Sequence, residues 1–252
     1  MQGGDVVRDF FLTGSASGIG RHLTTQLLAQ GHRVTASDID LEGLSSVAAK
    51  EGWDKDRLRI VGLDVRDGVG WERALTAASE TYGGLDVVMN IAGYLKPGYT
   101  HEFDPADIDR HFDINCKGVI HGTHAAAKLM VRQGRGHIIN IASMAALAPI
   151  PGLPLYSASK YAVRAFSLAA AEELRPLGVA VTVVCPDAVA TPMLDLQKDY
   201  AEAALTFSGS RVLTVQDIAD VILGRILTKR PVEVAIPASR ALLAKAANNF
   251  PG

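Results

Sequence analysis

Six short apolar runs are spread along the chain, and longer segments with helical spacing separate them. The runs cover residues 9–14, 32–38, 57–65, 85–93, 137–143 and 179–187. Apolar and polar residues do not alternate within them, which is typical of parallel strands buried on both faces. A helix is predicted from about Ile19 to Gln30, where Gly31 ends it. The pattern therefore predicts an α/β fold with a doubly wound parallel sheet and helices on both faces.

Capping signals predict where two later helices begin. Each signal combines a cap residue with an acid in the first turn. The signals are formed by Asp104, Pro105 and Asp107, and by Thr214 and Asp217. No linker or internal repeat divides residues 1–252, so a single domain is expected. Residues 192–213 are irregular, and a segment of that length in a compact domain is typical of a substrate loop or lid.

A glycine-rich turn, TGSASGIG, follows the first run and contains Gly14, Gly18 and Gly20. Its spacing is neither G-x-G-x-x-G nor that of a P-loop. Such glycines let the backbone approach a pyrophosphate at a helix N-terminus, but they also suit a simple tight turn. Asp38 lies 18 residues beyond Gly20, near the interval at which an acid binds a ribose hydroxyl. A helix cap is the alternative for Asp38, and the spacing favours the ribose.

Composition narrows the class of partner. The net charge is -2, with 48% hydrophobic and 21% charged residues, so no basic field favours nucleic acid. The two cysteines, Cys116 and Cys185, are predicted to be small buried hydrophobes in a reducing compartment. No leader-like or transmembrane-length run occurs. A soluble cytoplasmic protein that binds a small molecule is expected.

Tyr156 and Lys160 lie four residues apart, where a helix should begin after the proline-rich run PIPGLP. Residues at this spacing share one helical face, so a phenol would lie beside an ammonium. Tyrosine ionises near pH 10 in water, and a nearby cation would lower that pKa toward the range of a general base.

Taken together in their order along the chain, the motifs TGSASGIG, NIAG and YSASK, with Asp38, Asn115 and Ser143, resemble those of the classical short-chain dehydrogenase/reductase family. The resemblance covers essentially the whole chain. It implies one Rossmann-type domain with a seven-stranded parallel sheet, a homodimer or homotetramer, and NAD(H) or NADP(H) as coenzyme.

The resemblance also assigns site residues. The catalytic set that it implies is Asn115, Ser143, Tyr156 and Lys160. The cofactor-binding set that it implies is Gly14, Ser15, Ser17, Gly18, Ile19, Gly20, Asp38, Ile39, Asp64, Val65, Asn90, Ala92, Gly93, Tyr156, Lys160, Pro186, Val189 and Thr191. Within it, Asp64 and Val65 would contact adenine, and Thr191 would bind the carboxamide. Asn115 would hold a water that relays protons, although its helical position alone predicts a surface residue.

Two positions depart from the family pattern. Ile91 stands in the second place of the usual N-N-A-G, and Asp187 follows Pro186 where glycine is usual. Asp187 would either tune the substrate pocket or cap the following loop. The predicted substrate contacts are Tyr94, Met144, Leu153, Asp187 and Met193. Since this set is mostly apolar, a hydrophobic secondary alcohol or ketone is the expected substrate.

NAD is the predicted coenzyme. An acid at position 38 would repel the 2′-phosphate of NADP, and the positions where NADP-dependent members carry a cation hold Ser17 and Ile39. Arg33 should point away from the ribose. The alternatives are a catalytically silent dinucleotide-binding sensor or scaffold and an NADPH-dependent ketone reductase. An extended epimerase or dehydratase would need a longer C-terminal domain.

Three other features predict little chemistry. His121 and His124 are three residues apart on a helix, but no third ligand is near in sequence, so no metal is expected. Glu172 and Glu173 fit a solvated helix face. The tail, residues 238–252, carries Leu242 and Leu243 and is expected to dock on a neighbouring subunit rather than on a membrane.

Overall fold

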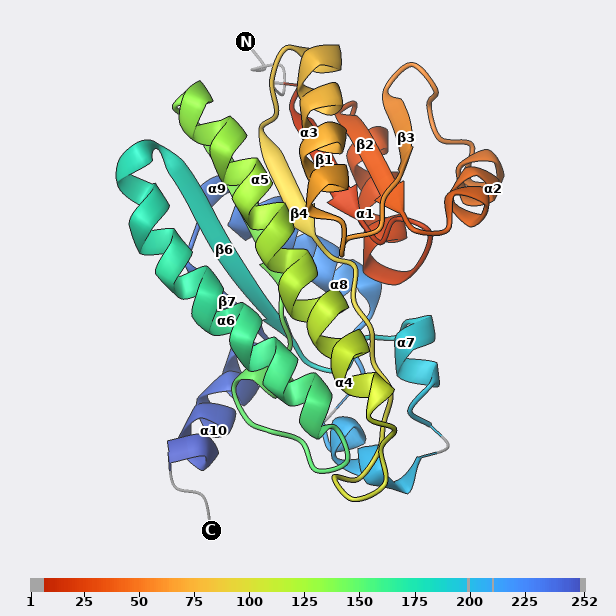
Figure 1. Cartoon of the computed structure of the whole chain (residues 1–252), viewed down its shortest axis with the longest axis vertical. Helices are drawn as coiled ribbons and strands as arrows, with labels where there is room; N and C mark the ends of the chain where they lie inside the picture. Colours follow the sequence, from red (N-terminus) through yellow and green to blue (C-terminus); the bar gives the residue numbers. More distant parts are fainter. Residues whose placement is uncertain (1–6, 199, 210, 250–252) are drawn as a thin grey trace.

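A computed structural model describes residues 7–198, 200–209 and 211–249 of the chain. Its centre is a parallel sheet of seven strands in the order β3-β2-β1-β4-β5-β6-β7 (Figure 1). The strands are β1 Asp9–Thr13, β2 Arg33–Asp38, β3 Leu58–Gly62, β4 Val87–Asn90, β5 Gly136–Ile141, β6 Val179–Pro186 and β7 Glu233–Ile236. The prediction of a doubly wound parallel sheet is confirmed.

Helices cover both faces of this sheet. They are α1 Gly18–Ala29, α2 Leu41–Glu51, α3 Gly68–Tyr82, α4 Ala106–His111, α5 Gly118–Gln133, α6 Pro154–Leu174, α7 Pro192–Asp195, α8 Val215–Asp220, α9 Leu227–Lys229 and α10 Ala238–Asn249. In Figure 1, α3, α5 and α6 lie in front of the sheet, while α1 and α8 lie behind it. The chain therefore forms three layers, with the sheet in the middle.

Neighbouring residues of one strand belong to two different cores, which explains the unbroken apolar runs. Phe10 and Leu12 of β1 pack in a cluster with Leu23 and Leu27 of α1. Phe11, between them, packs on the opposite face in a cluster that includes helices α3, α5 and α6. Since both faces are buried, apolar residues are needed at every position of the strand.

The direction of the chain reverses at the middle of the sheet. The first three strands run outward from β1 to β3, whereas β4 returns to the other side of β1 and the later strands follow it outward. Ligands of open α/β sheets bind at such a switch point, outside the carboxyl ends of the strands. The fold therefore directs attention to the loops that follow β1 and β4.

The helix-start signals hold in part. Thr214 and Asp217 form the full capping box that was expected at the start of α8. At α4 the helix begins one residue after Pro105, and Asp104 accepts a hydrogen bond from the Ala106 amide. Asp107 is buried and pairs with Lys96, so it is not simply a solvated first-turn acid.

The burial of two acidic residues and of the two cysteines tests the sequence-based expectations. Glu172 and Glu173 are exposed, as expected for a solvated face. Cys185 is buried in β6, but Cys116 is only partly buried, so the expectation of burial was wrong for that residue. Cys116 lies in the π-helical turn Phe112–Lys117, between α4 and α5. The neighbouring residue Asn115 is the one whose side chain is fully buried.

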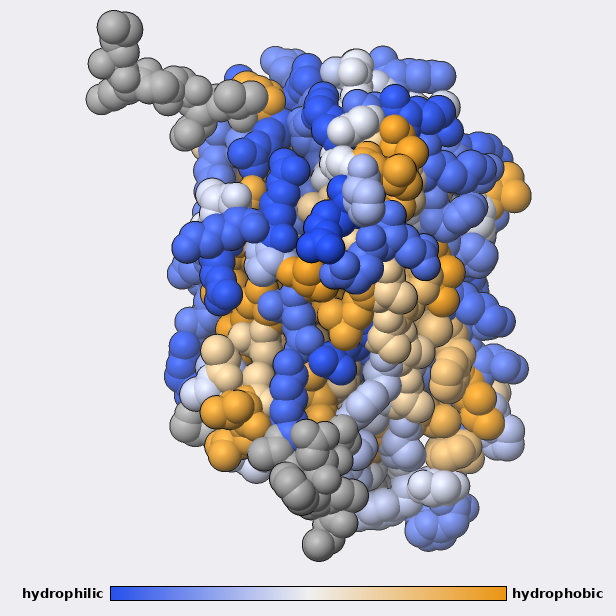
Figure 2. All heavy atoms as spheres, turned by 90° about the vertical axis from the view of Figure 1, so that its left-hand side faces the viewer, coloured by the Kyte–Doolittle hydropathy of each residue, from blue (hydrophilic) through white to orange (hydrophobic). Residues whose placement is uncertain are grey.

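The outer surface on the side of β7 and α10 is uneven in polarity. Figure 2 shows a mainly hydrophilic upper half and apolar side chains gathered in the lower half, toward the end of the molecule where Figure 1 places α10. Leu242 and Leu243 of α10 are 74% and 71% exposed. The expectation that they dock on another subunit stays a prediction. Residues 250–252 of the tail lie outside the described residues.

Candidate active site

The turn between β1 and α1 brings backbone amides to the mouth of a cleft. Gly14 and Gly18 have φ angles of +69° and +52°, which only glycine adopts readily. A Cβ at Gly20 would overlap the carbonyl of Gly14, so close packing of the turn requires a third glycine. The amides of the first turn of α1 carry partial positive charge and have no helical partner. The turn is therefore suited to a phosphate group.

Asp38 lies at the end of β2, beside this turn. Its carboxylate accepts hydrogen bonds from the backbone amides of Ala16 at 3.0 Å and Asp40 at 3.1 Å. The helix that follows is capped by Asp40, whose side chain accepts from the Gly43 amide. Asp38 is therefore not the cap of α2, and it lines the cleft together with Ile39. Arg33, at the other end of β2, pairs with Asp9 and points away from the cleft, as expected.

The loop after β3 forms the next part of the cleft wall. Asp64 and Val65 both line the cleft. Arg66 also lines it and binds Asp64 with two nitrogens, Nε at 2.9 Å and Nη2 at 2.6 Å. The Arg66 side chain holds the pKa of the Asp64 carboxyl below its usual value. This ion pair could not be predicted from the resemblance, which assigns a role to Asp64 and Val65 but none to Arg66.

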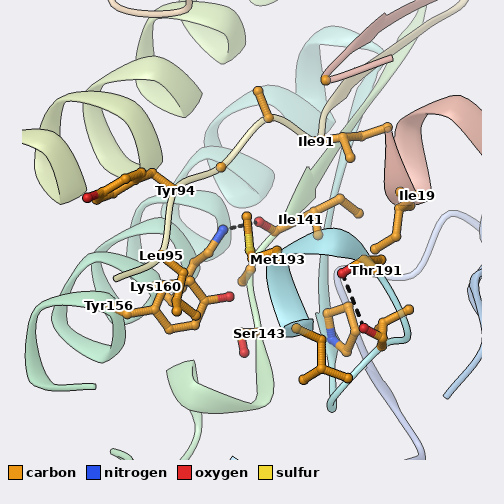
Figure 3. Close-up of a pocket in the computed structure, with 18 of the residues that line it drawn as sticks. Ile19, Ile91, Tyr94, Leu95, Ile141, Ser143, Tyr156, Lys160, Thr191 and Met193 are labelled. Carbon is orange, nitrogen blue, oxygen red and sulfur yellow. Dashed lines mark hydrogen bonds between the residues drawn. The ribbon is translucent and has the colours of Figure 1, made fainter. Parts of the chain in front are cut away.

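Ser143, Tyr156 and Lys160 converge at the centre of the cleft (Figure 3). Ser143 follows β5, while Tyr156 and Lys160 lie on the first turns of α6. The Lys160 ammonium donates a hydrogen bond to the Ile141 carbonyl at 3.0 Å and lies 5.6 Å from the centre of the Tyr156 ring. The predicted sharing of one helical face thus brings the phenol and the ammonium together.

Burial dominates the ionisation of this pair. It raises the pKa of Tyr156 to about 12, against a smaller opposing effect of a hydrogen bond with Ser143. It also lowers the pKa of Lys160 to about 8. The raised pKa of Tyr156 is opposite to the lowered phenol pKa that the sequence suggested. Burial disfavours both charged forms, and among the described residues no ion pair of either group offsets it. The phenol is therefore protonated near neutral pH and can donate a proton.

Asn115 is fully buried, so the expectation of a surface residue from its helical position alone was wrong. Its amide oxygen accepts from the Tyr94 backbone amide at 2.7 Å, and its nitrogen donates to the Tyr94 carbonyl at 2.8 Å. The nitrogen also donates to the Ser159 hydroxyl at 3.0 Å. Asn115 thus joins the segment after β4 to the helix that carries Tyr156 and Lys160.

The cleft has a total volume of about 920 Å³. The part that lies beside the predicted substrate residues is mostly apolar. Leu95, Leu153 and Ala203 form a small cluster, against which Tyr156 and Met193 pack. The predicted substrate residues all line the cleft. However, the Tyr94 hydroxyl donates to Asp107 at 3.2 Å, and Figure 3 shows its ring directed away from Tyr156.

Most of the predicted cofactor residues line one continuous surface of the cleft. They are Gly14, Ser17, Gly18, Ile19, Gly20, Asp38, Ile39, Asp64, Val65, Ala92, Gly93, Tyr156, Lys160, Pro186, Val189 and Thr191. Ser15 and Asn90 are not on this surface. Ser15 is buried and donates to the Leu12 carbonyl, and Asn90 is buried and donates to Asn140 of the next strand. Their side chains support the cleft from behind.

Besides Arg66, three residues with a part in the site were missed by sequence reasoning. Thr13, at the end of β1, accepts hydrogen bonds from the Ile91 and Ala92 amides at 2.9 and 3.1 Å and so fixes the segment after β4. Ser159 binds Asn115. Arg240 of α10 pairs with Asp187 at 2.8 Å. Only Ser159, inside YSASK, gave any signal in the sequence.

The part of the chain that the structure describes contains no cluster of three or more His, Cys, Asp or Glu side chains arranged to hold a metal ion. Within those same residues, no helix combines the length and the apolar character that crossing a membrane requires.

Comparison with known proteins agrees with this geometry. The family model of the short chain dehydrogenases matches residues 9–201. An uncharacterized oxidoreductase of Staphylococcus aureus is 31% identical over 223 residues, 88% of this chain and 92% of that protein. A 3-alpha-(or 20-beta)-hydroxysteroid dehydrogenase of Mycobacterium tuberculosis is 36% identical over 195 residues, 77% of this chain and 74% of that protein.

The fold is also that of solved structures. A short chain dehydrogenase/reductase from Burkholderia phymatum, in complex with NAD, superposes with a TM-score of 0.86 at 23% identity, covering 98% of this chain and 95% of that one. With the matched family model and relatives above 30% identity over most of its length, the chain belongs to the short-chain dehydrogenase/reductase family of oxidoreductases.

Proposed function

We propose that the chain is an NAD(H)-dependent oxidoreductase that interconverts a hydrophobic secondary alcohol and its ketone. The observation that carries the proposal is the convergence of Ser143, Tyr156 and Lys160 at the centre of a cleft whose far end holds Asp38. A protein that only senses or binds a dinucleotide has no use for a phenol and an ammonium at the point where a substrate would react. This argues against the silent sensor.

The residues of the cleft fit a nicotinamide dinucleotide. The amides of the glycine turn suit its pyrophosphate, and Asp38 suits a ribose diol because its carboxylate oxygens accept hydrogen bonds. Lys160 would hold the second ribose, and Thr191 the carboxamide. The dinucleotide, when bound, supplies or accepts the hydride.

Tyr156 would handle the proton. In ketone reduction, its protonated hydroxyl donates a proton to the carbonyl oxygen while Ser143 donates a hydrogen bond to the same oxygen. In alcohol oxidation the phenolate accepts the proton, and the positive charge of Lys160 lowers its cost. Asn115 acts indirectly, because its bonds to Tyr94 and Ser159 keep the segment after β4 against α6.

The carboxylate of Asp38 supports the choice of NAD. The 2′-phosphate of NADP would lie against this carboxylate, and two unit charges about 4 Å apart repel by about 4 kcal/mol at an effective dielectric constant near 20. Even half of that energy corresponds to more than a tenfold preference. Ser17 and Ile39, which line the cleft nearby, supply no compensating cation.

The apolar half of the cleft supports a hydrophobic substrate. Leu95, Leu153 and Met193 line the cleft and belong to the apolar cluster that includes Tyr156. The similarity to a hydroxysteroid dehydrogenase adds weight to a bulky, largely apolar alcohol or ketone. A homodimer or homotetramer is part of the same proposal.

A screen of secondary alcohols and ketones, including hydroxysteroids, tests the proposal through nicotinamide absorbance with both coenzymes. We expect turnover of apolar substrates and a kcat/KM at least about tenfold higher with NAD(H) than with NADP(H). Asp38→Ala should narrow that ratio, mainly by weakening NAD use. Equal efficiency with both coenzymes would refute the role of Asp38, and absence of turnover together with tight coenzyme binding would favour the sensor.

A further inference from the structure

Three segments far apart in the sequence meet around the guanidinium of Arg240. Its Nε lies 2.8 Å from Oδ2 of Asp187, directly after β6. Its Nη2 donates to the Ser208 hydroxyl at 2.9 Å, close to the end of the predicted substrate loop. All three residues line the cleft. One side chain thus connects the C-terminal helix, the end of β6 and the loop.

Gly209 leaves the space that this arrangement needs. A Cβ at position 209 would lie 2.8 Å from Nη1 of Arg240 and 3.3 Å from Oδ2 of Asp187. Gly209 does not have a positive φ angle, so its backbone conformation does not require glycine. The guanidinium therefore lies directly against the backbone of the loop, and any side chain at position 209 would displace it.

The charges of the pair make sense only together. The Asp187 side chain is 11% exposed, and a carboxylate so buried is costly without a cation beside it. Arg240 lies in the first turn of α10, where the helix dipole disfavours a cation. Each residue therefore occupies a position that is unfavourable for it alone. Because the two charges compensate each other, the pair provides no net charge for binding an ionic substrate.

Main-chain hydrogen bonds already join the two ends of the loop. Val189 and Leu213 form a parallel bridge, the Ala190 amide donates to the Leu213 carbonyl, and the Leu213 amide donates to the Ala188 carbonyl, both at 2.8 Å. The contact of Arg240 with Ser208 and Gly209 lies inside the loop, away from these hydrogen bonds. It is therefore an additional point at which the loop is held to the body of the protein.

We propose that Arg240 is a positioning residue, which uses Asp187 as its anchor to hold the end of the substrate loop against the cleft. Asp187 then holds the loop in place, rather than tuning the substrate pocket through direct contact with the substrate. The effect of Arg240 on catalysis rests on the proposed function. The loop residues Met193, Gln197 and Thr206 line the cleft, so their placement depends on how the loop is held.

The first test measures the loop without substrate or coenzyme. Tyr200 and Phe207 are 41% and 38% exposed and offer chymotrypsin two sites in this segment. In Arg240→Gln we expect cleavage there to be about fivefold faster than in the unmodified chain, since a released loop opens more often. Arg211→Gln is the matched control, because Arg211 lies in the same loop but pairs with Asp217 of α8, and neither residue lines the cleft. Its cleavage rate should not change.

The second test uses kinetics with whichever substrate the screen identifies. Arg240→Gln should raise the substrate KM about tenfold while kcat changes less than about threefold, and coenzyme binding measured by fluorescence should not change. Arg240→Lys should recover part of the loss. Gly209→Ala should raise KM less. The double variant should behave like Arg240→Gln alone, because the guanidinium that the methyl group would displace is then absent.

The proposal would be overturned by unchanged cleavage and KM in Arg240→Gln, or by effects of Arg240→Gln and Gly209→Ala that simply add. An equal effect of Arg211→Gln would also overturn it, since any loss of an ion pair would then loosen the segment. If no substrate is found, the proposed function fails while the cleavage test still decides the role of Arg240.

Discussion

Lys160 is an ammonium group that activity requires but that lies buried in the free protein. Its burial should therefore reduce the stability of the folded chain. Its side chain is 3% exposed, and burial lowers its pKa from the ordinary lysine value of 10.5 to about 8. At 1.36 kcal/mol per pKa unit, holding the charged form in the folded chain at pH 7 costs about 3 kcal/mol. We therefore consider Lys160→Met, which keeps an unbranched stem and removes the charge.

The substitution also removes a stabilising contact. The Ile141 carbonyl loses the hydrogen bond from Lys160, which costs about 1–2 kcal/mol. The variant should then be about 1–2 kcal/mol more stable than the unmodified protein at pH 7, and it should lose its turnover.

The sign of the pH dependence follows from proton binding. Between about pH 8 and 10.5 the unfolded chain retains the lysine proton that the folded chain has released, so the stability of the unmodified protein rises with pH relative to the variant. The advantage of Lys160→Met should thus be constant below pH 8 and should shrink above it. Urea unfolding of both proteins at a series of pH values measures this difference. The contributions of titrating groups that both proteins share cancel when the two free energies of unfolding are subtracted.

Lys50→Met is the control, since Lys50 is exposed in the last turn of α2. Its stability difference should not change over the same range. A Lys160→Met variant that is less stable than the unmodified protein by the same amount at every pH would refute the claim that a buried charge is held at a cost.

The remaining predictions concern the phenol and the turn. Tyr156→Phe should keep the fold and coenzyme binding but lose about 10³-fold in kcat, since a positioned acid or base contributes about 10²–10⁴-fold; near-normal turnover would exclude the phenol as the proton donor. Gly20→Ala should lower the thermal unfolding temperature and abolish coenzyme binding, because the methyl group would overlap the Gly14 carbonyl; a variant that binds NAD normally would show that the turn can relax at no cost.

Much of this protein follows from local sequence. The apolar runs identified six of the seven strands because a strand covered on both faces needs apolar residues at every position. The glycine turn was equally evident, since positive φ angles and close packing restrict Gly14, Gly18 and Gly20 individually. The spacing of Tyr156 and Lys160 was sufficient to place them together, because one helical turn separates them.

Tertiary structure alone decided the partners of the polar side chains. Asn115 has a helical position that predicts the surface, yet it is buried because the backbone of Tyr94, in the segment after β4, lies against it and satisfies its amide. Asp187 pairs with Arg240, a residue that lies on a different element far along the chain. Whether a polar group is buried depends on which distant groups can bind it, and only the packing of the helices against the sheet determines that.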